Sequence, residues 1–193
     1  MRSSYQRLAT LPLIGALGGG TPPVESCVGL LDALAIIHAP LEQAAAHAPV
    51  LATVWDETLR RLPLLERDLA ALPGPVADQR PALRPAVLRA LAVASQVRHR
   101  AIVEPASLVG TLWALSGPDL AMLLPRALIE QALHLREADR LAYLATRDRW
   151  LGPDWTAFLD RSEALLAAGL IERRRAVEAA TEIVDGLTWV VER

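Results

Sequence analysis

The sequence predicts an all-α protein, and three observations carry this prediction. The helix formers Ala, Leu, Arg and Glu dominate a chain of 193 residues, of which 52% are hydrophobic and 22% charged. Apolar residues recur at steps of three and four, whereas the β-branched and aromatic-rich runs typical of strands are missing. No internal repeat and no linker long enough to separate domains is present. We therefore expect a single domain over residues 1–193, built as a helical bundle.

The first predicted helix covers residues 3–17 and ends at three glycines, residues 18–20. Residues 21–23, Thr-Pro-Pro, then predict the start of a second helix, because proline is tolerated in a first helical turn. We expect Pro40 to bend this second helix. Its apolar face carries residues at helical spacing: Leu31, Leu34, His38, Leu41 and Ala45.

A third helical region is predicted to end at residues 72–75, Leu-Pro-Gly-Pro. One face of this region carries Trp55, Leu59, Leu62, Leu65, Leu69 and Leu72. Residues 77–85 are expected to form a proline-containing loop, followed by a helix over residues 85–96.

The most hydrophobic segment, residues 104–133, predicts a helix that is interrupted in its middle. The interruption consists of Ser116, Gly117, Pro118 and Asp119, where proline removes a backbone donor and crowds the preceding turn. The next predicted helix is capped by Asp154, or by Gly152 and Pro153, and ends at Gly169. The last helix is expected to bury Leu170, Val177, Ala180, Ile183, Val184, Leu187, Val190 and Val191.

Charge and composition exclude several function classes. The net charge of -2 gives no reason to expect a nucleic-acid partner. The chain contains no lysine, which excludes a Schiff-base lysine and a P-loop. Cys27 is the only cysteine, so neither a disulfide framework nor a thiolate metal cluster is expected, and a reducing cytoplasm fits best.

No secretion signal and no membrane span is expected. Arg2 and Arg7 precede a short apolar run that is similar to a signal peptide, but no clean cleavage site follows, so secretion is the less favoured alternative. Residues 105–118 are uncharged over 14 positions, whereas a membrane span needs roughly 20 residues.

One segment resembles a known family. Residues 110–122, GTLWALSGPDLAM, are similar to the pattern GALYVLEGSTLGG of the bacterial biliverdin-producing haem oxygenases found beside bacteriophytochromes. The identical positions are Gly110, Leu112, Leu115, Gly117 and Leu120. Four further pieces resemble family segments in the same order: LPLI at 11–14, HAPLE at 38–42, LPLLERDLAAL at 62–72 and WTAFL at 155–159.

The resemblance implies a haem-oxygenase-like helical bundle in which a kinked helix lies over the distal face of haem. Glycines in such a helix let the backbone approach closely, because no Cβ intervenes. The family's activity is oxidative degradation of haem to biliverdin, carbon monoxide and iron, so haem is both cofactor and substrate. The implied partners are haem or another tetrapyrrole and, as electron donor, a reductase or ferredoxin.

The chain departs from the family pattern at the residues that carry the chemistry. Tyr5 stands where the family has its iron-ligating histidine, Ser116 replaces a glutamate, and Ala121 and Met122 replace a glycine pair. The resemblance thus places Tyr5 as the metal ligand and assigns Ser116, Gly117, Ala121 and Met122 to cofactor binding. A tyrosinate ligand favours ferric iron, and the added side chains occupy space that the family leaves empty.

Two functions from different classes follow. The chain is either a haem oxygenase with an unusual iron ligand, or a catalytically inactive module of the same fold that binds another ligand or a protein. Tyr5 either ligates iron or packs its ring on the next helix. Met122 either fills the core or blocks the iron.

Two other groups of residues admit a functional and a structural interpretation. His38 with Glu42 and Glu130 with His134 are spaced for a di-metal site, but a hydrogen-bonded, partly buried His38 is favoured. His47 and His99 are expected to be solvated. Residues 60–61 and 173–175 are all arginine. They form either a positive patch for an acidic electron donor or for haem propionates, or, as we favour, solvated helix faces.

Overall fold

The described part of the protein is helical and contains no β-strand, as the sequence predicts. The computed structural model describes residues 6, 22–77, 84–117, 120, 124, 126–136, 140–146 and 153–191. The α-helices within these ranges are α3 (Val24–His47), α4 (Pro49–Ala52), α5 (Leu62–Ala70), α6 (Gly74–Ala77), α7 (Arg84–Val103), α8 (Leu108–Ser116), α10 (Arg126–Ala132), α11 (Ala142–Ala145), α13 (Pro153–Ala167) and α14 (Arg173–Val191). Two 3₁₀ turns, η1 (Glu57–Leu59) and η3 (Pro105–Ser107), connect them.

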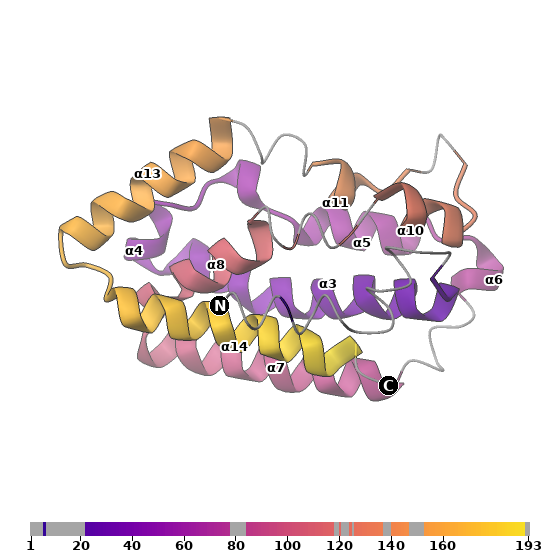
Figure 1. Ribbon diagram of the computed structural model, residues 1–193, viewed down its shortest axis with the longest axis horizontal. Coiled ribbons are helices and arrows are strands. Elements are labelled where there is room, and N and C mark those ends of the chain that lie inside the picture. The colour runs from indigo at the N-terminus through magenta and orange to yellow at the C-terminus, as the bar shows by residue number, and fades with distance from the viewer. Residues whose placement is uncertain are drawn as a thin grey trace.

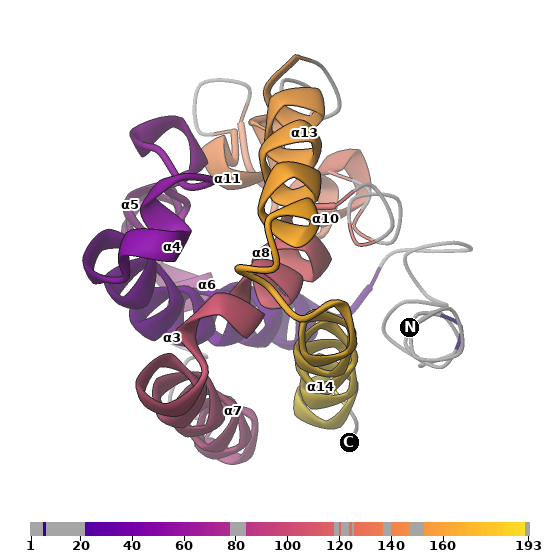
Figure 2. The same cartoon turned by 90° about the vertical axis from the view of Figure 1, so that its left-hand side faces the viewer.

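Helix α3 is the central element of the bundle. It packs against α7, α5, α4 and α14, and in both views it lies between the α7/α14 pair on one side and α5 and α11 on the other (Figures 1 and 2). It begins directly after Pro23, as predicted, and continues through Pro40. All five residues of its predicted apolar face are buried: Leu31, Leu34, His38, Leu41 and Ala45.

Helices α7 and α14 run side by side in opposite directions (Figure 1). Arg89, near the start of α7, donates a hydrogen bond to the carbonyl oxygen of Val190 at the end of α14, at 3.1 Å. Further along α7, the guanidinium of Arg100 bonds both carboxylate oxygens of Glu182, at 3.1 and 2.6 Å. These contacts fix the register of the pair.

The predicted third helical region is not one continuous helix. Its apolar residues are buried or half-buried as expected, but the chain forms η1 and then starts again as α5. The Asp56 side chain accepts the backbone N–H of Thr58 at the start of η1. The Glu42 side chain accepts the N–H groups of Arg61 and Leu62 at the start of α5. Each carboxylate satisfies donors that a continuous helix would bond internally.

Two further boundaries and the burial of two residues differ from the prediction. Residues 74–77 form helix α6, where the sequence predicted a helix end. Helix α7 begins at Arg84 and continues to Val103, seven residues beyond its predicted end, because no helix breaker interrupts it. Leu170 and Val177 are exposed, because Leu170 precedes α14 and Val177 lies on the outer side of that helix. The other predicted core residues of α14 are buried or half-buried.

One helix is long and apolar enough to span a membrane by length and composition, so the expectation that no segment is so is wrong. Helix α3 has 24 residues with a mean hydropathy of 1.5 over its most apolar window. Asp32 and Glu42 are charged residues within this otherwise largely apolar helix. Of that window, 67% is buried inside the fold, which is what a core helix requires.

Candidate functional site

The predicted helix break lies at the end of α8. Ser116 is the last residue of this helix, and Gly117 follows with extended backbone, φ -72° and ψ 164°. The N–H of Gly117 still donates to the carbonyl oxygen of Trp113, at 2.8 Å. A Cβ placed on Gly117 would lie 2.7 Å from that oxygen and 3.4 Å from the ring of Trp155. A larger residue is disfavoured here because its side chain would lack space. The backbone angles of Gly117 are not the reason, since any residue can adopt them.

Aromatic rings form one wall beside the break. Trp155, in the first turn of α13, stacks on Phe158 with ring centroids 5.3 Å apart and an interplanar angle of 18°. Trp113 of α8 lies 6.3 Å from Trp155, centroid to centroid. Both tryptophans are half-buried, whereas Phe158 is fully buried. Apolar aromatic surface of this kind suits a flat, largely apolar ligand.

Of the predicted site residues, the structure places Ser116 and Gly117 together at the break. Tyr5, Ala121 and Met122 lie outside the described residues, so their assigned roles stay predictions. Sequence reasoning missed Trp155 as a neighbour of Gly117. Trp155 belongs to the segment WTAFL, but it is far from Gly117 in the sequence. No local sequence pattern could therefore predict their contact.

A second feature is a buried polar cluster, which consists of His38, Glu42, Arg61 and Tyr143. His38 is 1% exposed, and its Nδ1 lies 3.5 Å from Oε1 of Glu42. Its ring meets the ring of Tyr143 edge-on, with centroids 5.9 Å apart and an interplanar angle of 74°. Within the described part of the chain, neither ring nitrogen has a hydrogen-bond partner. His38 is therefore more deeply buried and less well satisfied than the sequence predicted.

Glu42 holds the start of α5 in place. Its Oε1 accepts the backbone N–H groups of Arg61 at 2.6 Å and Leu62 at 2.7 Å. Burial would raise the pKa of Glu42, but His38 and these two N–H donors stabilise the carboxylate and hold the pKa below its usual value. The guanidinium of Arg61 donates to the carbonyl oxygen of Thr58, at 2.8 Å. Burial lowers the pKa of Arg61 to about 10.

Two more carboxylates bind the start of α11. Asp68 of α5 accepts the N–H groups of Ala142 and Tyr143, both at 2.8 Å. Burial raises the pKa of Asp68 despite these two donors. Glu130 of α10 accepts the N–H of Leu141 at 3.0 Å and the Nε–H of Arg126 at 2.7 Å. The acidic residues of this region thus connect neighbouring elements of the fold.

This use of the carboxylates argues against the di-metal alternative. Glu42 and Glu130, two of its ligands, bond backbone amides instead. His134 is exposed at the turn after α10. Among the described residues, no group of three or more His, Cys, Asp or Glu side chains is arranged to hold a metal ion.

The start of α13 influences both the break and the buried polar cluster. The charge of Asp154 opposes the lowering of the Arg61 pKa, and the next residue, Trp155, lies beside Gly117. The first turn of α13 therefore lies beside the break and exerts a charge effect on the cluster. The cluster supplies polar groups and the break supplies an apolar, aromatic surface.

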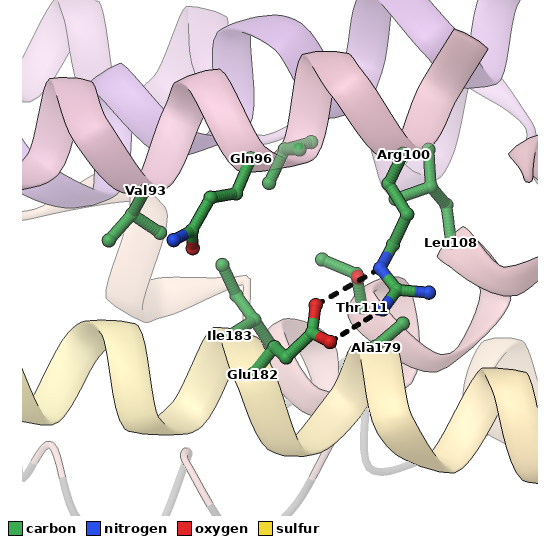
Figure 3. A pocket seen from close by; sticks show the side chains of 9 residues that line it. Val93, Gln96, Arg100, Leu108, Thr111, Ala179, Glu182 and Ile183 are labelled. Atoms are coloured by element: carbon green, nitrogen blue, oxygen red, sulfur yellow. Dashed lines mark hydrogen bonds and ion pairs between the residues drawn. The ribbon is translucent and has the colours of Figure 1, made fainter. Parts of the chain in front are cut away.

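A cavity elsewhere in the bundle, between α7, α8 and α14, is too small for a ligand (Figure 3). Its volume is about 10 Å³, enough for about one water molecule. Figure 3 shows Arg100 and Glu182 joined across the space between α7 and α14. This arrangement is typical of an interhelical packing defect.

The predicted arginine patches are neutralised by neighbouring carboxylates. Arg174 bonds Glu172 and Glu178, each at 3.2 Å. Arg173 bonds Glu163 at 3.2 Å, and Arg175 bonds Glu178 at 3.1 Å. Of residues 60–61, Arg60 is paired with Glu57 at 3.1 Å, and Arg61 is buried. The geometry favours the solvated helix face for residues 173–175.

The solvated positions predicted for two other histidines are confirmed. His47, the last residue of α3, is exposed, and its Nδ1 lies 2.7 Å from the carbonyl oxygen of Gln43. His99 is exposed within α7. Neither residue contributes to the buried polar cluster.

The fold is similar to that of heme oxygenase-1 from the cyanobacterium Synechocystis sp. PCC6803, solved in complex with heme, with a TM-score of 0.71. The two chains share 18% sequence identity, and the match covers 98% of this chain and 85% of the other. At this identity the likeness shows the fold: the chain has the all-α fold of the haem oxygenases. No protein-family model and no curated protein sequence matches the chain.

Proposed function

We propose that this protein binds haem and degrades it oxidatively to biliverdin, carbon monoxide and iron, as the haem-oxygenase resemblance implies. The observation that carries the proposal is the break of α8 at Ser116 and Gly117 beside an aromatic wall, in a chain that shares its fold with a haem-bound protein. Further assignment to the bacteriophytochrome-associated type rests on the sequence resemblance alone.

The residues that would hold haem are those that the resemblance assigns. Tyr5 would ligate the iron, and Ser116, Gly117, Ala121 and Met122 would contribute to haem binding. When bound, haem supplies an iron that binds and activates oxygen, with electrons from a reductase or a ferredoxin.

Two observations support the fit of a tetrapyrrole to the described residues. The half-buried rings of Trp113 and Trp155 offer apolar surface next to the break, and the buried ring of Phe158 packs against Trp155. His38 carries two buried nitrogens with no hydrogen-bond partner in the described chain. Buried polar groups in native proteins are rarely left unsatisfied, so a polar group or water brought in with a ligand would account for them.

The test is a haem titration of the purified protein, followed by absorbance and repeated with Tyr5→Phe. The expected result is a saturable Soret band at one haem per chain, with a phenolate charge-transfer band that Tyr5→Phe removes. Tyr143→Phe is the matched control, because Tyr143 is the only other tyrosine of the chain. This control should keep the charge-transfer band.

Turnover is measured next, with ascorbate or a reductase as electron donor and the bilin spectrum as readout. A bilin product is expected. The absence of any saturable Soret band would contradict haem binding. Haem that binds but survives reductant and oxygen would contradict degradation and leave the alternative of a catalytically inactive binding module.

A further inference from the structure

The outer face of α7 exposes several large apolar residues. Leu88 is 66% exposed and Ile102 is 81% exposed, and Leu91 and Val103 are exposed as well. Within the described part of the chain, no element covers this side of α7, which is the outermost helix of its layer (Figure 2). Single exposed apolar residues are common on protein surfaces, but several large ones on one side of a helix are typical of an interaction site.

The exposed residues follow one line along the helix. Leu88, Ser95 and Ile102 are spaced seven residues apart and so share one side of α7 over about 21 Å. Leu91, Ala92 and His99 flank this line, and all three are exposed. We call these six residues the α7 stripe. The stripe itself contains no arginine and no carboxylate. Arg98 stands at one edge, and along the other edge Ala92, Ser95 and His99 share a groove with charged residues: Arg100, Glu104, Arg175 and Glu182.

We propose that two copies of this protein associate through the α7 stripe, with the two α7 helices antiparallel about a two-fold axis at Ser95. The order of residues along the stripe indicates that the partner is a second copy of the protein. Rotation about Ser95 places Leu88 of one copy against Ile102 of the other, and Leu91 against His99. The two ends of the stripe are large and apolar, and its centre is small, so the pattern is complementary to itself. A two-fold interface requires such self-complementarity.

The neighbouring helix widens the proposed interface at its ends. Trp189 of α14 is 47% exposed. The residue after it, Val190, accepts the hydrogen bond from Arg89, so Trp189 lies at the same end of the α7/α14 pair as Leu88. In the antiparallel pair, this end faces Ile102 of the second copy.

The area of the surface sets the expected strength. Helix α7 has 20 residues and is therefore about 30 Å long. The surface formed by α7 and the neighbouring α14 is about 20 Å wide. Its area is therefore about 600 Å² for each copy. Two copies would bury about 1,200 Å², the lower end of specific interfaces. We therefore expect a reversible dimer with a Kd in the micromolar range.

Sedimentation velocity over a range of protein concentrations tests the dimer. The expected result is a monomer–dimer equilibrium whose Kd rises at least tenfold in Ile102→Glu, because a carboxylate would face Leu88 of the second copy. Leu170→Glu is the matched control, since Leu170 is a similarly exposed apolar residue outside α7, and its Kd should not change. A monomer at every concentration would overturn the proposal, as would equal effects of the two variants. Thermal melting confirms that both variants fold.

Cross-linking tests the register. Ser95→Cys should form covalent dimers with a short bismaleimide. Leu88→Cys mixed with Ile102→Cys should cross-link, whereas Leu88→Cys alone should not, because its two copies lie about 21 Å apart. The native Cys27 is buried and its pKa is raised to about 12 by burial, so background reaction is low. Cross-linking of Leu88→Cys to itself would overturn the antiparallel register.

A membrane surface is the competing partner for the stripe. Binding to anionic phospholipid vesicles that Ile102→Glu abolishes, while the sedimenting mass of the protein stays that of a monomer, would overturn the dimer in favour of a membrane surface.

Discussion

Gly110 of α8 lies directly against the backbone of Ala176 in α14. A Cβ placed on Gly110 would be 1.8 Å from the carbonyl oxygen of Ala176 and 2.6 Å from its carbonyl carbon. The two helices therefore touch backbone to backbone, without side chains between them. This contact positions α8, and with it the break at Gly117, against the last helix of the fold.

Replacement of Gly110 by alanine should destabilise the fold severely. The added methyl group meets backbone atoms that cannot rotate away, so α8 and α14 must separate. We expect Gly110→Ala to lower the free energy of unfolding by about 3 kcal/mol or more, at the upper end of overpacking effects. Urea unfolding followed by far-ultraviolet circular dichroism measures this change.

Gly74 provides the control for the Gly110 variant. Gly74 is the first residue of α6, and a Cβ on it would meet no atom within 4 Å. Gly74→Ala should leave stability unchanged or raise it by up to about 1 kcal/mol, through the lower entropy of the unfolded chain. A similar loss in the two variants would show that the close approach of α8 to α14 is not what requires glycine at position 110.

The end of α8 should respond to Gly117→Ala in a different way. The new Cβ would meet the carbonyl oxygen of Trp113 at 2.7 Å, while the ring of Trp155 at 3.4 Å can shift. We expect a loss of about 1–3 kcal/mol and a change in the fluorescence of Trp113 and Trp155. Haem affinity should fall in parallel if the break lines the haem site. Unchanged tryptophan fluorescence would contradict the proximity of Gly117 to Trp155.

The sequence predicts the helical class, the start of α3 and its buried face, because each depends on local spacing. It does not predict the start of α5, because that start depends on Glu42, a residue 19 positions before Arg61. The break at Gly117 could be predicted from its neighbours, whereas its contact with Trp155 of α13 could not. The burial of His38 follows from its place on the apolar face of α3, but periodicity does not reveal whether a buried imidazole has a partner.

Glu42 should make stability depend on pH in the acidic range. The folded-state pKa of Glu42 lies below its usual value of 4.5, so the unfolded chain binds more protons and stability rises with pH. The contribution of the carboxylate is fully present above pH 4.5 and is lost as pH falls through the folded-state pKa. Glu42→Gln should cost about 2 kcal/mol at pH 7, and the difference from the parent protein should shrink below pH 4.5.

Urea unfolding at several pH values measures the Glu42 effect. Glu57→Gln is the matched control, because Glu57 is exposed and its pair with Arg60 lies in solvent. Exposed pairs contribute little, so this control should change stability by less than about 1 kcal/mol. A difference between Glu42→Gln and the parent that stays constant from pH 7 to pH 3 would contradict the ionised state assigned to Glu42.

Two opposing effects should leave His38 with a small net contribution to the stability of the ligand-free protein. Its two ring nitrogens are buried without a hydrogen-bond partner in the described chain, so His38→Leu removes a desolvated polar group, but it also removes the attraction of the imidazole to the Glu42 carboxylate. We expect the free energy of unfolding to change by less than about 1 kcal/mol in either direction. Glu42→Ala, by contrast, strips two backbone N–H groups of their acceptor and should cost about 3 kcal/mol.

If His38 serves a bound ligand, His38→Leu should weaken haem binding in the titration while the protein remains about as stable as its parent. A loss of stability above about 2 kcal/mol in His38→Leu would instead show that the imidazole is held by a structural hydrogen bond.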